Sequence, residues 1–154
     1  MITIYTTPSC SSCRKAKKWL DQHKVPYREK NLFNHRIDGN DIENMLFHAE
    51  NGFDDIISRR SKVFKEFNLD VEDMSVFELK DFIVNHPSIL KRPIIVDAKR
   101  MQVGYNDEEI RVFIPKQLRE MLMKENTEDD FTHYQDTLNR YFKKVGLDEK
   151  ASHN

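Results

Sequence analysis

Apolar residues recur along the chain at two spacings, one typical of strands and one typical of helices. Residues 1–6 are rich in β-branched and aromatic side chains and predict a strand, which Pro8 ends. Residues 11–23 then predict a helix, because apolar side chains recur on one of its sides. Those side chains are Ala16, Trp19 and Leu20. Residues 26–31 predict a second strand, so the chain opens with a β-α-β unit.

From residue 38 to residue 87, the apolar residues recur only at the spacing of helices. The predicted helices span residues 38–49, 53–58, 61–67 and 76–84. Ser75 and Glu78 form a capping-box pattern at the start of the last helix. Gly52 follows the first helix as a residue that ends it. We therefore expect residues 37–91 to form an inserted helical domain.

Strand character returns at residues 92–97, and residues 101–105 pair back on them as a hairpin. A helix is predicted next at residues 107–113, where three acidic side chains in the first turn favour a helix N-terminus. With the opening β-α-β unit, this β-β-α unit predicts an α/β fold with a thioredoxin-like mixed sheet. The sheet domain would comprise residues 1–36 and 92–124.

The C-terminal region, residues 125–154, is expected to be an extension with an extra helix. Residues 126–130 are polar and acidic, and behind them apolar side chains recur three and four residues apart. This spacing predicts an amphipathic helix that ends at Gly146. The apolar stripe comprises Phe131, Tyr134, Leu138, Tyr141, Phe142 and Val145. Two interpretations stay open: the helix docks on this protein's own surface, or it docks on a partner.

Composition narrows the class of protein further. A chain of 154 residues is about one domain's worth and long enough to bury a core. The net charge of −1 means that the chain as a whole has no excess of positive charge that would argue for nucleic-acid binding. Charged residues nevertheless make up 33% of the chain and cluster locally. The N-terminal residues lack the pattern of a signal peptide, and no apolar run is long enough to span a membrane. We expect a cytoplasmic protein.

Cys10 and Cys13, the two cysteines of the chain, lie where the first strand gives way to the first helix. Unpaired N–H groups and the positive end of the helix dipole favour a thiolate there, and Arg14 and Lys15 add positive charge. We therefore expect the pKa of Cys10 to be lowered. Cys13, one turn into the helix, is expected to be more shielded and to act as the resolving thiol. This spacing is typical of a thiol–disulfide switch.

Two alternatives to a redox pair stay open. A zinc site would need two further ligands, and the six histidines show no ligand-like spacing. Two inert thiols are the other alternative. A disulfide across about four residues would stabilise the fold by only ~2 kcal/mol, against ~3 kcal/mol for fifteen residues. A reversible switch is therefore favoured over a structural staple, and no metal or other cofactor is expected.

Five motifs occur in order along the chain. They are YTTPSCSSCRKA (5–16), ENG (50–52), IISRRSK (56–62), LKRPIIVD (90–97) and KRMQVGYNDEEIR (99–111). This set resembles the Spx-type global transcriptional regulators, within the arsenate reductase-like (ArsC) family, over about residues 1–118. From about residue 125 onward the chain is unlike the usual short tail of the family, so nothing carries over to that region.

The resemblance implies a redox-sensing transcriptional regulator that binds the C-terminal domain of the RNA polymerase α subunit. It would control genes of the thiol-oxidative stress response through a Cys10–Cys13 disulfide, and Gly52 would contact the polymerase. Pro93 resembles the cis-proline found opposite the active cysteine in thioredoxin-like folds. Arg92 would then lie near the thiols, as an anion-binding residue or a redox relay. A monomer is expected, and the family also resembles substrates of the Clp protease, which an adaptor would help to recruit through the C-terminus.

Several of these residues also have a simpler interpretation. Gly52 fits a plain helix C-cap, and Arg92 fits a surface arginine at a strand edge. Arg59, Arg60 and Lys62 fit a solvated basic face, or else a contact to polymerase or to promoter phosphates. Promoter DNA is expected to be bound only in complex with polymerase, because the chain is nearly neutral and has no basic stripe with base-reading residues.

The alternative function is arsenate reduction, or a glutaredoxin-like thiol oxidoreduction, with Cys10 as the nucleophile. Reductases of the family hold the oxyanion with arginines, and Arg60 (or Arg59) and Arg92 could supply two. The third is expected where this chain has residues 103–106, VGYN, and three acids follow directly. One missing charged donor removes roughly 1.5–3 kcal/mol of anion stabilisation. We therefore predict a regulator rather than an enzyme.

Overall fold

The computed structural model describes residues 1–125 and 131–145. The strands are β1 (Ile2–Thr6), β2 (Tyr27–Asn31), β3 (Ile94–Val96) and β4 (Met101–Val103). The α-helices are α1 (Ser11–Gln22), α2 (Gly39–His48), α3 (Lys62–Phe67), α4 (Val76–Asn85), α5 (Lys116–Glu125) and α6 (Phe131–Val145). Within these ranges the 3-10 helices are η1 (Gly52–Asp55), η2 (Pro87–Ile89) and η3 (Glu109–Phe113).

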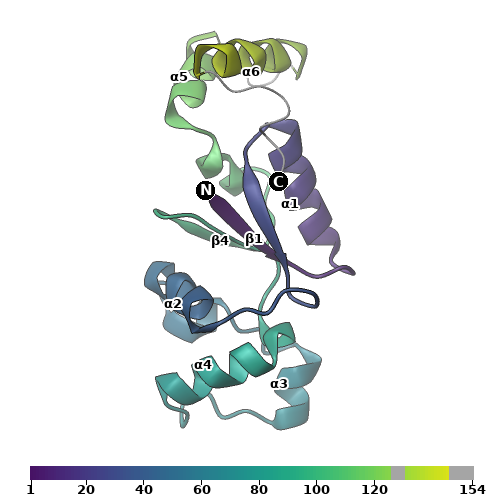
Figure 1. Ribbon diagram of the computed structural model, residues 1–154, viewed down its shortest axis with the longest axis vertical. Helices are drawn as coiled ribbons and strands as arrows, with labels where there is room; N and C mark the ends of the chain where they lie inside the picture. Colours follow the sequence, from purple (N-terminus) through teal and green to yellow (C-terminus); the bar gives the residue numbers. More distant parts are fainter. Residues whose placement is uncertain (126–130, 146–154) are drawn as a thin grey trace.

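The strands form one mixed sheet in the order β2-β1-β3-β4. β1 pairs with β2 in parallel, and β3 is antiparallel to both β1 and β4. The register places Ile4 opposite Ile95, and Ile95 opposite Gln102. This is the thioredoxin-like arrangement that the β-α-β and β-β-α units predict, and Figure 1 shows the sheet in the middle of an elongated molecule.

The two faces of the sheet are buried by different parts of the chain. Successive side chains of a strand point to opposite faces. Ile4 and Ile95 therefore pack into one core, with α1, η3, α5 and α6. Tyr5 and Ile94 pack into the other, with the helices between β2 and β3. The sequence from residue 37 to residue 91 thus shares a core with the sheet, while the predicted domain boundaries stay a prediction.

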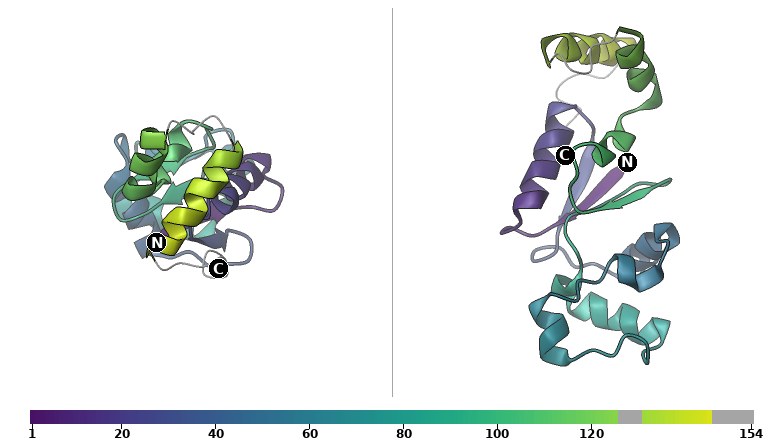
Figure 2. Two further views of the ribbon diagram at one scale, coloured as in Figure 1. Left: turned by 90° about the horizontal axis from the view of Figure 1, so that it is seen from above. Right: turned by 180° about the vertical axis from the view of Figure 1, so that it is seen from behind.

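Helix α5 lies within a stretch for which the apolar pattern predicts no element. Helix α6 is the predicted amphipathic helix, and Figure 2 shows it crossing the end of the molecule beside α5. Leu138, Tyr141 and Phe142 are at most 8% exposed and belong to the α1 core. Through these three side chains, α6 docks on the protein's own surface. The side chains of Phe131, Tyr134 and Val145, the acidic residues 126–130 and the predicted stop at Gly146 lie outside the described residues.

Two predicted helices are only short 3-10 turns, η1 and η3. In the first case the Asp55 carboxylate accepts hydrogen bonds from the backbone N–H groups of Glu50 and Asn51, at 2.8 and 3.0 Å. These bonds hold a turn in place of a longer helix. Gly52 is also not the helix C-cap, because α2 ends at His48 and Ala49 is its cap. Across the described residues, every helix is too short or too polar to cross a membrane.

Candidate functional site

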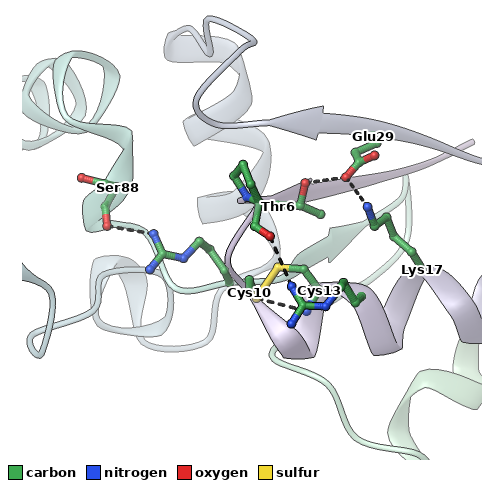
Figure 3. Close-up of a disulfide and its surroundings, with 9 residues drawn as sticks. Thr6, Cys10, Cys13, Lys17, Glu29 and Ser88 are labelled. Atoms are coloured by element: carbon green, nitrogen blue, oxygen red, sulfur yellow. Dashed lines mark hydrogen bonds and ion pairs between the residues drawn. A yellow bond between two sulfur atoms is a disulfide. The ribbon is translucent and has the colours of Figure 1, made fainter.

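The sulfur pair lies at the start of α1, where the sequence places it. Cys10 is the N-cap residue, and its Sγ accepts a hydrogen bond from the Cys13 backbone N–H at 3.0 Å. The two cysteines form a disulfide with their Cα atoms 5.2 Å apart (Figure 3). Cys13 is 1% exposed, whereas Cys10 is partly exposed. Cys10 is therefore the sulfur that a reagent or partner reaches first.

A polar network holds the strand that leads to the cysteines against α1 and β2. Figure 3 shows Thr6 and Lys17 converging on Glu29. The Thr6 hydroxyl donates to Glu29 Oε2 at 2.6 Å, and Lys17 Nζ lies 3.0 Å from the same oxygen. Burial by itself would raise the pKa of Glu29, but these two donors outweigh it and lower that pKa. The ionised carboxylate of Glu29 on β2 therefore links β2 to β1 and to α1.

Cys10 opens into a cleft of about 840 Å³ that four parts of the chain line. The lining comes from residues 7–12, 48–58, 90–92 and 101–104. The first part holds the disulfide, and the second belongs to the segment inserted between β2 and β3. Side chains far apart in the sequence therefore face one space, which Cys10 of the disulfide and the inserted segment both line.

Arg92 lines this cleft together with Cys10, and its neighbour Lys91 lines it too. The Arg92–Pro93 peptide is cis, as the sequence predicts. The Arg92 guanidinium donates to the carbonyl oxygen of Ser88 at 3.3 Å, a contact drawn in Figure 3. The location favours the predicted place near the thiols over an isolated arginine at a strand edge.

Gly52 lies in a turn that its neighbours hold in shape. Its φ is +62°, and a Cβ built on it would meet no atom within 4 Å. The glycine is exposed, and the Asp55 carboxylate anchors the preceding backbone. Hydrogen bonds from the Asn51 backbone, above all, lower the pKa of Asp55 and keep it ionised. The turn therefore leaves exposed backbone beside the cleft.

Arg59, Arg60 and Lys62 lie apart from the cysteines. Arg59 and Arg60 line a separate hollow of about 450 Å³ on the far side of Ser58. Arg59 pairs with Asp54 at 2.9 Å, and Lys62 lies 3.7 Å from Glu66. Of the arginines that an oxyanion site would use, only Arg92 lines the cleft, where Glu50 and Asp55 also lie.

Sequence reasoning missed two groups of residues near the site. Lys91 and His48 line the cleft, and His48 Nε2 is buried without a hydrogen-bond partner among the residues that the structure describes. Asp41 accepts hydrogen bonds from Tyr5 and Lys30, and so fastens α2 to the sheet. The signal for Asp41 is its place three residues after Asp38, in the capping box of α2.

Comparison with known proteins places this architecture in a family. Residues 5–113 match the ArsC family. The chain belongs to the ArsC family. Among its relatives is the protein named Global transcriptional regulator Spx of Streptococcus pneumoniae, 52% identical over 125 residues, which are 81% of this chain and 94% of that relative. The protein of the same name from Bacillus subtilis is 48% identical, with 81% of this chain and 95% of the relative covered.

Solved structures of ArsC-like proteins share the fold at lower identity. A possible arsenate reductase from Streptococcus mutans is 24% identical with a TM-score of 0.62, covering 69% of this chain and 92% of the other. Arsenate reductase from Vibrio cholerae is 20% identical with a TM-score of 0.62, covering 74% and 97%. At these identities the likeness supports the thioredoxin-like ArsC fold and does not extend to activity.

Proposed function

We propose that this ArsC-family chain is a redox-sensing transcriptional regulator that uses the Cys10–Cys13 disulfide as its switch. Relatives 45–52% identical to it carry the name Global transcriptional regulator Spx. The observation that carries the proposal is the cleft, because Cys10, Arg92 and the 48–58 segment line it together. A change of redox state at the sulfur then changes the cleft that residues on both sides of Gly52 also line.

Coupling requires that the disulfide favour one of two arrangements of its surroundings. In the oxidised protein the Arg92 guanidinium bonds to the Ser88 carbonyl, at the end of the inserted segment. Reduction would create a thiolate at Cys10, at the positive end of α1. That negative charge attracts Arg92 across the cleft and competes with Ser88. Arg92 is therefore the relay between the switch and the inserted helices.

The partner we propose is the C-terminal domain of the RNA polymerase α subunit, bound around Gly52. The turn is exposed, held by Asp55 and open to close backbone approach. Promoter DNA would be contacted only in that complex, with Arg59, Arg60 and Lys62 as candidate phosphate contacts. A monomeric, cytoplasmic protein and control by the Clp protease with an adaptor remain predictions; the tail concerned, residues 146–154, lies outside the described residues.

Binding to the purified α C-terminal domain, in both redox states, tests the proposal. We expect Gly52→Arg to reduce the affinity at least about tenfold, because a partner backbone that approaches the glycine would meet a long side chain. Ala98→Arg is the control for added bulk and charge, since Ala98 is exposed in the turn between β3 and β4 and does not line the cleft. If the wild type binds the α C-terminal domain in neither the oxidised nor the reduced state, the proposal is wrong. Unchanged binding by Gly52→Arg would place the contact elsewhere.

Arsenate reduction is the alternative function, with Cys10 as the attacking thiolate. Solved reductases share the fold, which is the observation in its favour. Against it, Arg92 and Lys91 share their cleft with the carboxylates of Glu50 and Asp55, which oppose an oxyanion. Arsenate-dependent NADPH consumption in a glutathione–glutaredoxin coupled assay would establish the enzyme. A rate equal to the blank without protein would leave regulation as the function.

A further inference from the structure

The near-neutral net charge of the chain conceals two regions of opposite sign. Residues 1–36 contain eight Lys or Arg and two Asp or Glu, whereas residues 37–91 contain six Lys or Arg and twelve Asp or Glu. The helices of the second region lie at one end of the molecule, and α1 runs along the sheet outside that end (Figure 1). Since the potential at a surface is set by nearby charges, these two surfaces attract different partners.

Three of the eight basic residues of the first region lie on one side of α1. The buried face of the helix carries Cys13, Ala16, Trp19 and Leu20. Arg14, Lys15 and Lys18 project from the opposite face, where all three are exposed. Residues three and four apart on a helix are neighbours, so the three cations form one stripe. The stripe begins one turn after Cys10.

These three cations are not neutralised by the protein itself. The Arg14 guanidinium donates to the carbonyl oxygen of Pro8 at 3.2 Å. Within residues 1–125 and 131–145, none of the three forms an ion pair. In the inserted segment Arg59 pairs with Asp54 and Lys62 lies near Glu66, whereas Arg60 forms no ion pair within the described residues. The α1 stripe therefore holds three unpaired cations, against one among these three basic residues of the inserted segment.

A shallow hollow of about 590 Å³ lies beside the stripe and is lined by residues from two parts of the chain. Lys15, Lys18 and Gln22 line it from α1, and Asn106 lines it from the segment after β4. The two amides can donate hydrogen bonds to phosphate oxygens. Asp107 also lines the hollow and accepts a hydrogen bond from Tyr105. Its carboxylate limits anion contacts to the α1 side.

We propose that Arg14, Lys15 and Lys18 of α1 contact phosphates of promoter DNA while the inserted segment holds the polymerase domain. The proposal rests on the function proposed above and adds a DNA-facing surface to it. Phosphate contacts need cations at the surface and carry no base sequence information, which suits a regulator brought to its promoters by polymerase. The stripe would be a second phosphate-contacting surface beside Arg59, Arg60 and Lys62 of the inserted segment.

The test compares two triple variants of the oxidised full chain. Arg14→Gln/Lys15→Gln/Lys18→Gln removes the stripe, and Lys99→Gln/Lys116→Gln/Lys124→Gln removes three exposed cations elsewhere. Binding to the α C-terminal domain is measured first, and then the affinity of that complex for a fluorescent duplex promoter fragment between 50 and 200 mM salt. The duplex is also titrated with each protein alone at low salt, so the stripe is tested even if the polymerase domain does not bind.

The stripe variant should bind the polymerase domain like the wild type, and should lose roughly tenfold or more in DNA affinity. The slope of log affinity against log salt should fall by about 2–3, since each phosphate contact contributes about 0.9. The control variant should retain the wild-type slope. Equal slopes and affinities for the stripe variant and the wild type, or equal losses in both variants, would overturn the proposal. A wild type that binds the duplex through the stripe but ignores the polymerase domain would instead contradict the function proposed above.

Discussion

The substitution Tyr5→Phe tests how the inserted segment is fastened to the sheet. The Tyr5 hydroxyl on β1 donates to Asp41 Oδ1 at 2.6 Å, and Lys30 Nζ on β2 lies 2.7 Å from the same oxygen. The other Asp41 oxygen accepts the backbone N–H of Asp38 at 2.9 Å, within the capping box of α2. Tyr5 is 2% exposed and Asp41 is 8% exposed, so water replaces these bonds poorly.

Removing the hydroxyl deletes one hydrogen bond to a buried carboxylate. Such bonds contribute about 1.5–3 kcal/mol, and Asp41 keeps its other two donors, so we expect a loss of about 1.5–2 kcal/mol in the free energy of unfolding. Tyr27→Phe is the matched control. Its hydroxyl also donates to a carboxylate, that of Asp21 at 2.9 Å, but Tyr27 is only partly buried. Water can replace that bond, and we expect a loss of about 0.5–1 kcal/mol.

Urea unfolding at pH 7, followed by fluorescence of Trp19, gives both values from the transition midpoint at constant slope. Repeating it at lower pH adds an independent check. Burial by itself raises the pKa of Asp41, but hydrogen bonds from Lys30 and Tyr5 hold it below the ordinary value of 3.8. The stability from Asp41 is therefore present above that value and disappears as the pH falls through the folded-state pKa. Equal losses in Tyr5→Phe and Tyr27→Phe would refute the reasoning.

Two further predictions concern the α1 core and the polar network around Glu29. Leu138→Ala should lower the free energy of unfolding by about 2–5 kcal/mol in urea, because Leu138 is fully buried in the α1 core. The control Asn139→Ala, on the exposed side of α6, should lower it by less than about 1 kcal/mol. Equally small losses in both variants would mean that α6 does not stabilise the fold. Glu29→Gln should make the free energy of unfolding fall less steeply as the pH is lowered on the acid side of the pH–stability curve. The pKa of Glu29 is lowered from 4.5, so its contribution is lost as the pH falls below that value, and an unchanged acid limb would contradict the network.

Local pattern was sufficient to predict most of the elements. The strand at residues 2–6 and helix α1 follow from spacing and from the residues that end them, which act within one or two turns of chain. The position of Cys10 at the helix start is local in the same sense. Helix α5 and the short turn η1 were not predicted correctly. Hydrogen bonds from Asp55 shape η1, and no spacing of apolar residues reports them.

The site was predicted only in part, for a different reason. The motifs around Arg92 and Gly52 identify candidate residues, yet they do not say which side chains share a cleft. The fold places Arg92 on the cleft that Cys10 lines and Arg59 and Arg60 in a neighbouring hollow, while Lys91 lines both. That arrangement arises because residues 48–58 face the same cleft as residues 7–12, from which they are far apart in the sequence.

The disulfide itself is thus a local property of the sequence, because two cysteines three residues apart at the start of a helix lie close enough to bond. What lies opposite the disulfide is decided by the tertiary structure. The alternation of side chains along β1 and β3 gives the sheet two buried faces, one holding α1 and the other holding the inserted helices. Because both faces are covered to bury apolar area, Cys10 comes to line the same cleft as Glu50 and Asp55, on either side of Gly52.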